Sequence, residues 1–321
     1  MELLPDFELI RPATIDEAVT AGARAEARYI AGGTALIPNL RRGVGAPSVM
    51  VDLTEIEELG SIDEIDGRLH IGAGVTLAQL ISDPRLQVDY PLVAQVALGI
   101  AGETHRQSAT VGGNLCLDTR CQFYNQSEWW RKANNYCLKY RGDICHVATN
   151  SATCKAAYAG ELAPALMLQG AYVEIASPTG RRSIALEDMY QEDGADYLLL
   201  APGELLVSIN VGKLEGYNTA YRKVRVRGGI DYPLVGVAMA TLGNVQGIED
   251  IRIAMTGTNS RPLVLKGTEV LAGKPLDDAA IKVLDKLVRT QTKPMRSTLM
   301  PGPYRSKVVV NVTKRLAREL L

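Results

Sequence analysis

The five cysteines of this 321-residue chain are confined to one short segment, from Cys116 to Cys154, and the rest of the sequence has none. The same segment holds both tryptophans, Trp129 and Trp130, although only 5% of the chain is aromatic. From about 120 to 160, polar, aromatic and cysteine residues mix without the period of a helix or a strand. Such a segment is organised by something other than an apolar core. In a reducing compartment, clustered thiols favour a metal site over disulfides.

The composition is that of a globular protein with two or three compact units. Hydrophobic residues make up 46% of the chain and charged residues 22%, which is enough to build a core. The formal net charge of −1 gives no reason to expect nucleic acid or a membrane surface as a partner. No apolar run reaches the length of a membrane span, and residues 1–14 lack the pattern of a signal peptide. We therefore expect a cytoplasmic protein.

Local patterns predict an α+β fold, because strands are grouped before helices in the last third of the chain. Helical periodicity and capping residues predict helices at 14–27, 76–81, 91–100, 161–169, 277–290 and 306–320. Strands are predicted at 28–31, 48–53, 221–226, 234–242 and 248–255. Hairpins are predicted to turn at Asp66-Gly67 and at Pro178–Gly180. An extended segment is expected to lead into Thr110–Asn114.

Two glycine pairs are candidate phosphate-binding loops. Gly32-Gly33-Thr34 follows a predicted strand and precedes a helical turn, so its successive backbone N–H groups can cradle a pyrophosphate. Gly112-Gly113-Asn114 offers a second such loop, in which Thr110 and Asn114 would add side-chain hydrogen bonds. A single glycine pair is most often a turn, but two such loops in one chain suit a dinucleotide. Neither loop matches a Rossmann or Walker pattern.

Four segments resemble a known family in their order and spacing: YIAGGTALIPNL, ATVGGNL, GELLVSI and YRKVRVRGGIDYPLVGVAMA. Together they resemble the FAD-binding medium subunits of the xanthine oxidase and carbon monoxide dehydrogenase family, over the whole chain. The resemblance implies a two-subdomain PCMH-type (vanillyl-alcohol-oxidase-like) FAD-binding fold followed by a C-terminal α+β domain. The implied domains are 1–55, 56–215 with an insertion at about 120–160, and 216–321.

The resemblance also implies which residues contact FAD, position by position. The first loop would meet the pyrophosphate and ribose, Ile100 would pack beside the flavin, and Glu161 would bind ribityl or ribose hydroxyls. The full set of implied contacts is Ile30, Ala31, Gly32, Gly33, Thr34, Ala35, Leu36, Ile100, Thr110, Val111, Gly112, Gly113, Asn114, Glu161, Leu206 and Lys223. The chain departs from the family at Ala35, where an acidic or polar residue is common, and at Glu161, where Asp is usual. No nucleophile–base constellation suggests a catalytic residue.

A long extra segment between Asn114 and Glu161 is absent from ordinary relatives. It holds the predicted metal ligands Cys121, Cys137, Cys145 and Cys154. Their spacing lacks the C-x-x-C pairs of structural zinc sites, whereas scattered thiolates with aromatic cover favour a [4Fe–4S] cluster. Zinc, free thiols and ligation by His146 are the weaker alternatives. Cys116, directly behind the second glycine loop, is predicted to be a core thiol.

Within the family, an iron–sulfur insertion at this place resembles that of the medium subunit of 4-hydroxybenzoyl-CoA reductase. The resemblance implies an electron-transfer subunit that passes electrons from ferredoxin through the cluster and FAD toward [2Fe–2S] and molybdenum centres. Those centres would lie in a small [2Fe–2S] subunit and a large molybdopterin subunit of a complex that reduces 4-hydroxybenzoyl-CoA to benzoyl-CoA. Two alternatives stay open: a medium FAD subunit of an oxidising molybdenum hydroxylase, or a zinc-stabilised docking subunit.

Overall fold

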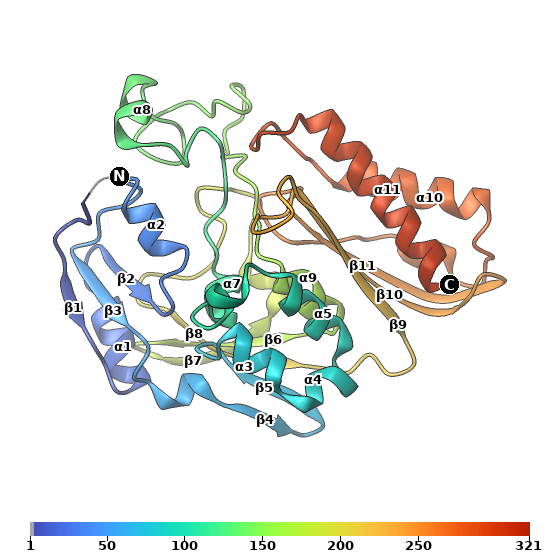
Figure 1. Cartoon of the computed structure of the whole chain (residues 1–321), viewed down its shortest axis with the longest axis horizontal. Coiled ribbons are helices and arrows are strands. Elements are labelled where there is room, and N and C mark those ends of the chain that lie inside the picture. Colours follow the sequence, from blue (N-terminus) through green and yellow to red (C-terminus); the bar gives the residue numbers. More distant parts are fainter. Residues whose placement is uncertain (1–2) are drawn as a thin grey trace.

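The computed structural model describes residues 3–321, in which the strands form three separate sheets (Figure 1). The first sheet is parallel, in the order β1-β3-β2, and consists of β1 (Glu8–Ile10), β2 (Ala27–Ile30) and β3 (Val49–Asp52). Helix α1 (Ile15–Gly22) connects β1 to β2, and the Thr14 side chain caps it by accepting a hydrogen bond from the Glu17 N–H at 3.2 Å. Helix α2 (Leu36–Leu40) follows β2 after the first glycine loop.

The second sheet is antiparallel and has the order β4-β5-β8-β6-β7. Its strands are β4 (Ile62–Ile65), β5 (Arg68–Gly72), β6 (Tyr172–Ser177), β7 (Gly180–Ala185) and β8 (Leu205–Val211). Both predicted hairpins are present. Asp66 and Gly67 have φ angles of 52° and 71°, as a tight turn of the primed type requires. The central strand β8 was not predicted, although it contains the LLVSI part of the GELLVSI segment.

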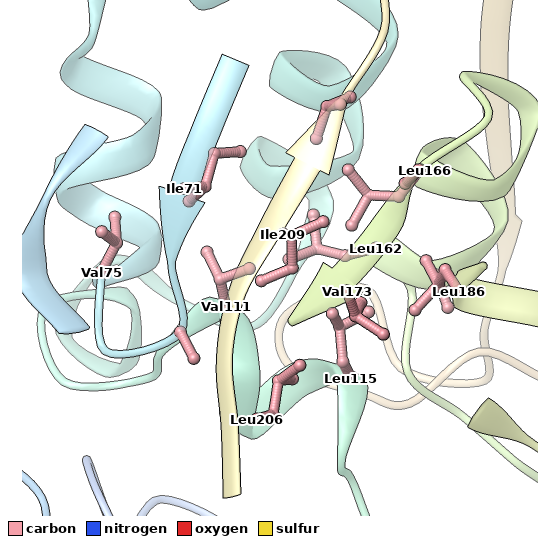
Figure 2. Close-up of a cluster of buried hydrophobic side chains, with 14 of the residues drawn as sticks. Ile71, Val75, Val111, Leu115, Leu162, Leu166, Val173, Leu186, Leu206 and Ile209 are labelled. Atoms are coloured by element: carbon pink, nitrogen blue, oxygen red, sulfur yellow. The ribbon is translucent and has the colours of Figure 1, made fainter. Parts of the chain in front are cut away.

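Short helices cover one face of this second sheet. They are α3 (Leu77–Ser82), α4 (Pro84–Asp89), α5 (Pro91–Gly99), α6 (Glu103–Arg106), α7 (Val111–Leu115) and α9 (Leu162–Leu168). Figure 2 shows their core contact with the sheet, where side chains of α7 and α9 meet Val173 of β6 and Ile209 of β8. The expected extended approach is present only at Thr110, which is extended and bridges Thr76, because the short helix α6 and a turn precede it. Thr110 caps α7, and its Oγ1 accepts a hydrogen bond from the Gly113 N–H at 3.0 Å.

The third sheet is antiparallel, in the order β12-β11-β10-β9, and two long helices pack against it. Its strands are β9 (Asn218–Val224), β10 (Val235–Asn244), β11 (Gly247–Thr256) and β12 (Leu263–Val264), and the helices are α10 (Asp278–Gln291) and α11 (Gly302–Leu320). Single turns of 3-10 helix lie at Glu57–Gly60, Leu186–Met189 and Thr268–Leu271. The architecture confirms the predicted α+β fold, while the domain boundaries stay a prediction. Among the helices of residues 3–321, none is long and apolar enough to cross a membrane.

The cysteine-containing insert projects from the second sheet as an irregular loop (Figure 1), as predicted, with one short helix, α8 (Glu128–Ala133). Its two ends are held together, because Asn114 Oδ1 accepts hydrogen bonds from the N–H groups of Glu161 (3.1 Å) and Leu162 (3.0 Å). Farther out, Gln122 N–H donates to the Ser297 carbonyl at 2.8 Å. The Arg131 guanidinium donates to the Gly43 carbonyl at 2.6 Å. The insert is therefore fixed to both neighbouring parts of the chain.

Candidate cofactor sites

A cavity of about 1350 Å³ is lined by segments from all three parts of the fold. Its wall includes the first glycine loop, Ile100 and Ala101, the second glycine loop, and the 195–206 segment. The insert contributes Tyr124, Lys139, Tyr140 and Arg141. The volume exceeds the roughly 300–1,000 Å³ of ordinary small-molecule pockets, so the cavity has room for an extended dinucleotide.

All of the predicted FAD contacts line this cavity except Val111 and Lys223. Val111 is fully buried, and its N–H donates to the Val75 carbonyl at 2.9 Å. Lys223 lies behind the wall, where its Nζ donates to Glu161 Oε2 at 2.7 Å and to the Gly99 carbonyl at 3.2 Å. These two residues therefore support the wall from behind.

The first glycine loop presents unused donors to the cavity. Within residues 3–321, none of the N–H groups from Gly32 to Leu36 donates to another backbone group. Gly33 has a φ of 64°, a left-handed conformation that favours glycine. Gly32 packs so closely on Ser108 that a Cβ atom would lie 1.7 Å from the Ser108 carbonyl oxygen. Adjacent free N–H groups on a cavity wall are suited to phosphate oxygens, and pyrophosphate binding by this loop stays a prediction.

The second glycine loop differs from expectation, because its donors are already used. Gly112 N–H donates to the Ala73 carbonyl at 2.8 Å, and Gly113 N–H to Thr110 Oγ1 at 3.0 Å. The Thr110 and Asn114 side chains, expected to bond to FAD, instead cap α7 and join the two ends of the insert. A Cβ atom on Gly112 would lie 2.7 Å from Ala73 Cβ. The glycines of this loop thus permit close packing.

Glu161 lies in the cavity wall with both carboxylate oxygens engaged. Tyr221 OH donates to Oε1 at 3.0 Å, and Lys223 Nζ to Oε2 at 2.7 Å. The residue is only 3% exposed. Burial raises the pKa of the Glu161 carboxyl, and the Lys223 ammonium acts against that rise. Neither partner was expected from local sequence, since both come from β9 in the third sheet.

A second, small cavity lies inside the insert, and its wall contains all four predicted ligands, Cys121, Cys137, Cys145 and Cys154. Each of these thiols is at most 8% exposed. Burial raises the pKa of Cys121 to about 11 and that of Cys154 to about 12. Ala156 N–H donates to Cys154 Sγ at 3.4 Å. Cys116 does not line this cavity; it lies on the wall of the large one, among core residues.

The four thiols surround the small cavity without meeting at one point. Among residues 3–321, no group of three or more His, Cys, Asp or Glu side chains is arranged to hold a single metal ion. A ring nitrogen of His146 lies 2.5 Å from the Tyr136 carbonyl oxygen, so that nitrogen already has a partner. A cubane cluster holds its irons apart at the corners of a cube, each with its own thiolate. The four thiols border one shared space in the insert, and which metal centre they would hold stays a prediction.

Two side chains, Tyr124 and Lys139, line both the large and the small cavity. They form the partition between the candidate flavin site and the four thiols. Sequence reasoning missed both residues. No local pattern singles them out.

Comparison with known proteins agrees with this geometry. Residues 5–213 match the FAD binding domain in molybdopterin dehydrogenase, and residues 219–320 match the CO dehydrogenase flavoprotein C-terminal domain. The aldehyde oxidoreductase FAD-binding subunit PaoB of Escherichia coli is 32% identical over 246 residues, which are 74% of this chain and 76% of that protein. The carbon monoxide dehydrogenase medium chain of Afipia carboxidovorans is 28% identical over 314 residues, 96% of this chain and 94% of that one.

A solved structure of the Cu,Mo-CO dehydrogenase contains a chain that superposes with a TM-score of 0.80 at 26% identity, covering 98% of each chain. These matches establish membership of the family. The narrower resemblance to the medium subunit of 4-hydroxybenzoyl-CoA reductase stays a prediction. The chain belongs to the family of FAD-binding medium subunits that includes the medium chain of carbon monoxide dehydrogenase.

Proposed function

We propose that this chain is an electron-transfer subunit that binds FAD in the large cavity and a [4Fe–4S] cluster at Cys121, Cys137, Cys145 and Cys154. One observation carries the proposal. The four thiols line a cavity that shares Tyr124 and Lys139 with the candidate FAD cavity. Redox centres bound in two cavities that share wall residues would be placed to exchange electrons.

The large cavity supports FAD through different kinds of contact along its length. The free N–H groups from Gly32 to Leu36 suit the pyrophosphate. Ile100 and Leu206 provide apolar wall, and Glu161 is held in place by its two partners. When bound, FAD supplies two-electron chemistry. Two one-electron oxidations of a cluster would balance one two-electron reduction of FAD.

The sequence pattern suggests no nucleophile–base constellation for chemistry on an organic substrate, and this favours a role within a larger complex. Relatives named as medium chains and FAD-binding subunits support assembly with other subunits. We therefore propose a hetero-oligomer with a large molybdopterin subunit and a small [2Fe–2S] subunit, with ferredoxin as the electron donor.

Two directions of electron flow are distinguished by different observations. The relatives include carbon monoxide and glyceraldehyde dehydrogenases, whose names denote oxidation, and they support a medium subunit of an oxidising molybdenum hydroxylase. The cysteine insert is the feature that supports reductive removal of the hydroxyl of 4-hydroxybenzoyl-CoA. Reduced ferredoxin and 4-hydroxybenzoyl-CoA, given to the purified complex, should yield benzoyl-CoA in the reductive case. Absence of this product, with substrate-driven flavin reduction by an aldehyde, would establish the oxidising case.

The cluster is tested by metal analysis of the complex purified without oxygen. Wild-type protein should contain iron and sulfide beyond the share of the small subunit, with a matching EPR signal on reduction. Alanine at Cys121, Cys137, Cys145 or Cys154 should remove or convert that signal. Cys116→Ala is the matched control, because this thiol lies outside the small cavity, and it should keep the signal. Zinc in place of iron, or an unchanged signal in all four variants, would refute the cluster.

A further inference from the structure

Lys139 is a buried charge with one acidic partner. Its side chain is 5% exposed, and its Nζ lies 2.6 Å from Asp118 Oδ1. The same ammonium donates to the Gly194 carbonyl at 2.8 Å and to both oxygens of Thr119. A charge held this firmly and shielded from water exerts a strong field on its neighbours, because little solvent screens it.

The ion pair has a defined orientation relative to the two cavities. Lys139 lines both, whereas Asp118 lines only the large one and is 34% exposed. The ammonium lies 4.8 Å from the centroid of the Tyr124 ring, in the partition between the cavities. Lys139 lines the small cavity together with the four thiols. Its positive charge therefore acts on the thiols, while the carboxylate faces the candidate flavin site.

We propose that Lys139 and Asp118 set the reduction potentials of the two centres in opposite senses. This inference rests on the proposed function. Reduction adds negative charge to a cluster, and the potential of a cluster depends on nearby charge and on burial. The Lys139 ammonium stabilises the reduced cluster and raises its potential. The Asp118 carboxylate opposes this effect and disfavours added negative charge on the flavin side.

A purely structural role is the competing explanation, because Lys139 is also linked to the backbone of Cys154 through hydrogen bonds of Gly194. Gly194 accepts from Lys139 through its carbonyl and donates through its N–H to the Cys154 carbonyl at 2.9 Å. If the role is structural, loss of either Lys139 or Asp118 would weaken this link and shift the cluster potential in the same direction. An electrostatic role instead predicts shifts of opposite sign for the two members.

The test compares Lys139→Met with Asp118→Asn in the assembled complex. Both variants lose the same ion pair, and the cluster potential is measured by redox titration of its EPR signal. Lys139→Met should shift the potential to more negative values and Asp118→Asn to more positive values. Lys139→Arg keeps the charge and should stay close to wild type. Flavin content, iron content and the flavin potential are measured in parallel.

The outcomes separate the inference from the proposed function. A wild-type complex without the insert's cluster would refute the proposed function and this inference with it. A normal cluster whose potential is unchanged, or moves in the same direction, in both variants would refute only the electrostatic role. If Lys139→Met fails to retain its cluster, the other two variants carry the test. A positive shift of the cluster potential in Asp118→Asn, with no shift in Lys139→Arg, supports the proposal. Any other result overturns it.

Discussion

The Glu161 carboxylate forms an ion pair with Lys223 in the wall of the large cavity, with Oε2 and Nζ 2.7 Å apart. The two side chains are only 4% and 8% exposed. The backbone N–H of Glu161 also donates to Asn114 Oδ1. One residue thus joins the end of the insert, the cavity wall and the third sheet, which makes its partners good places to test the architecture.

Lys223→Met should destabilise the chain strongly, because it leaves the Glu161 carboxylate buried without a cation. Breaking a buried pair in this way costs about 3–5 kcal/mol, measured as the free energy of unfolding in urea. The loss should shrink as pH falls, since protonation removes the unpaired charge. Lys213→Met is the control, because its pair with Asp89 is partly exposed and should contribute far less to stability. Equal losses in both variants would contradict the prediction.

Gly32→Ala should abolish stoichiometric FAD binding. The added Cβ atom would lie 1.7 Å from the Ser108 carbonyl oxygen, so the first loop must move away from its present position. Gly60→Ala is the matched control, because nothing lies within 4 Å of its Cβ position. Flavin content per chain, measured by absorbance after purification, distinguishes the two. Retention of full flavin by Gly32→Ala would show that this loop is not part of the site.

Asn114→Ala should loosen the neck of the insert. It leaves the N–H groups of Glu161 and Leu162 without their acceptor, and an unsatisfied buried donor costs about 1–3 kcal/mol. Faster hydrogen exchange at these two amides is the expected signal. Asn114→Asp retains an acceptor oxygen and should exchange more slowly than the alanine variant. Identical exchange in both variants would mean that Asn114 does not hold the neck.

Glu204→Gln should make stability less sensitive to acid. Arg182 bonds to Glu204 Oε1 at 2.9 Å and lowers the pKa of that carboxyl from 4.5. A lowered folded-state pKa stabilises the protein above the ordinary pKa, and this contribution is lost as pH falls toward the folded value. Because Arg182 is 43% exposed, the effect should be about 1 kcal/mol or less. Urea unfolding from neutral to acidic pH should show wild type and variant converging at the acidic end.

The sequence alone was sufficient for several features whose signal is local. The turn at Asp66-Gly67, the glycine loop after β2 and the segment without periodicity all follow from backbone preference or side-chain pattern, and each is present as predicted. The grouping of the cysteines predicted that they would lie together, and all four line one small cavity of the insert. These features depend on residues close together in the chain.

Tertiary structure alone decided what each loop can offer a ligand. The second glycine loop looks like the first in sequence, but Ala73 from another segment lies against it and takes a donor that a phosphate would need. Lys223 reaches Glu161 from a different sheet, and Lys139 separates two cavities only because the insert folds back over the large one. The physical reason is the same in each case. Hydrogen-bond satisfaction and burial depend on which distant segments pack together, and local sequence patterns do not predict that packing.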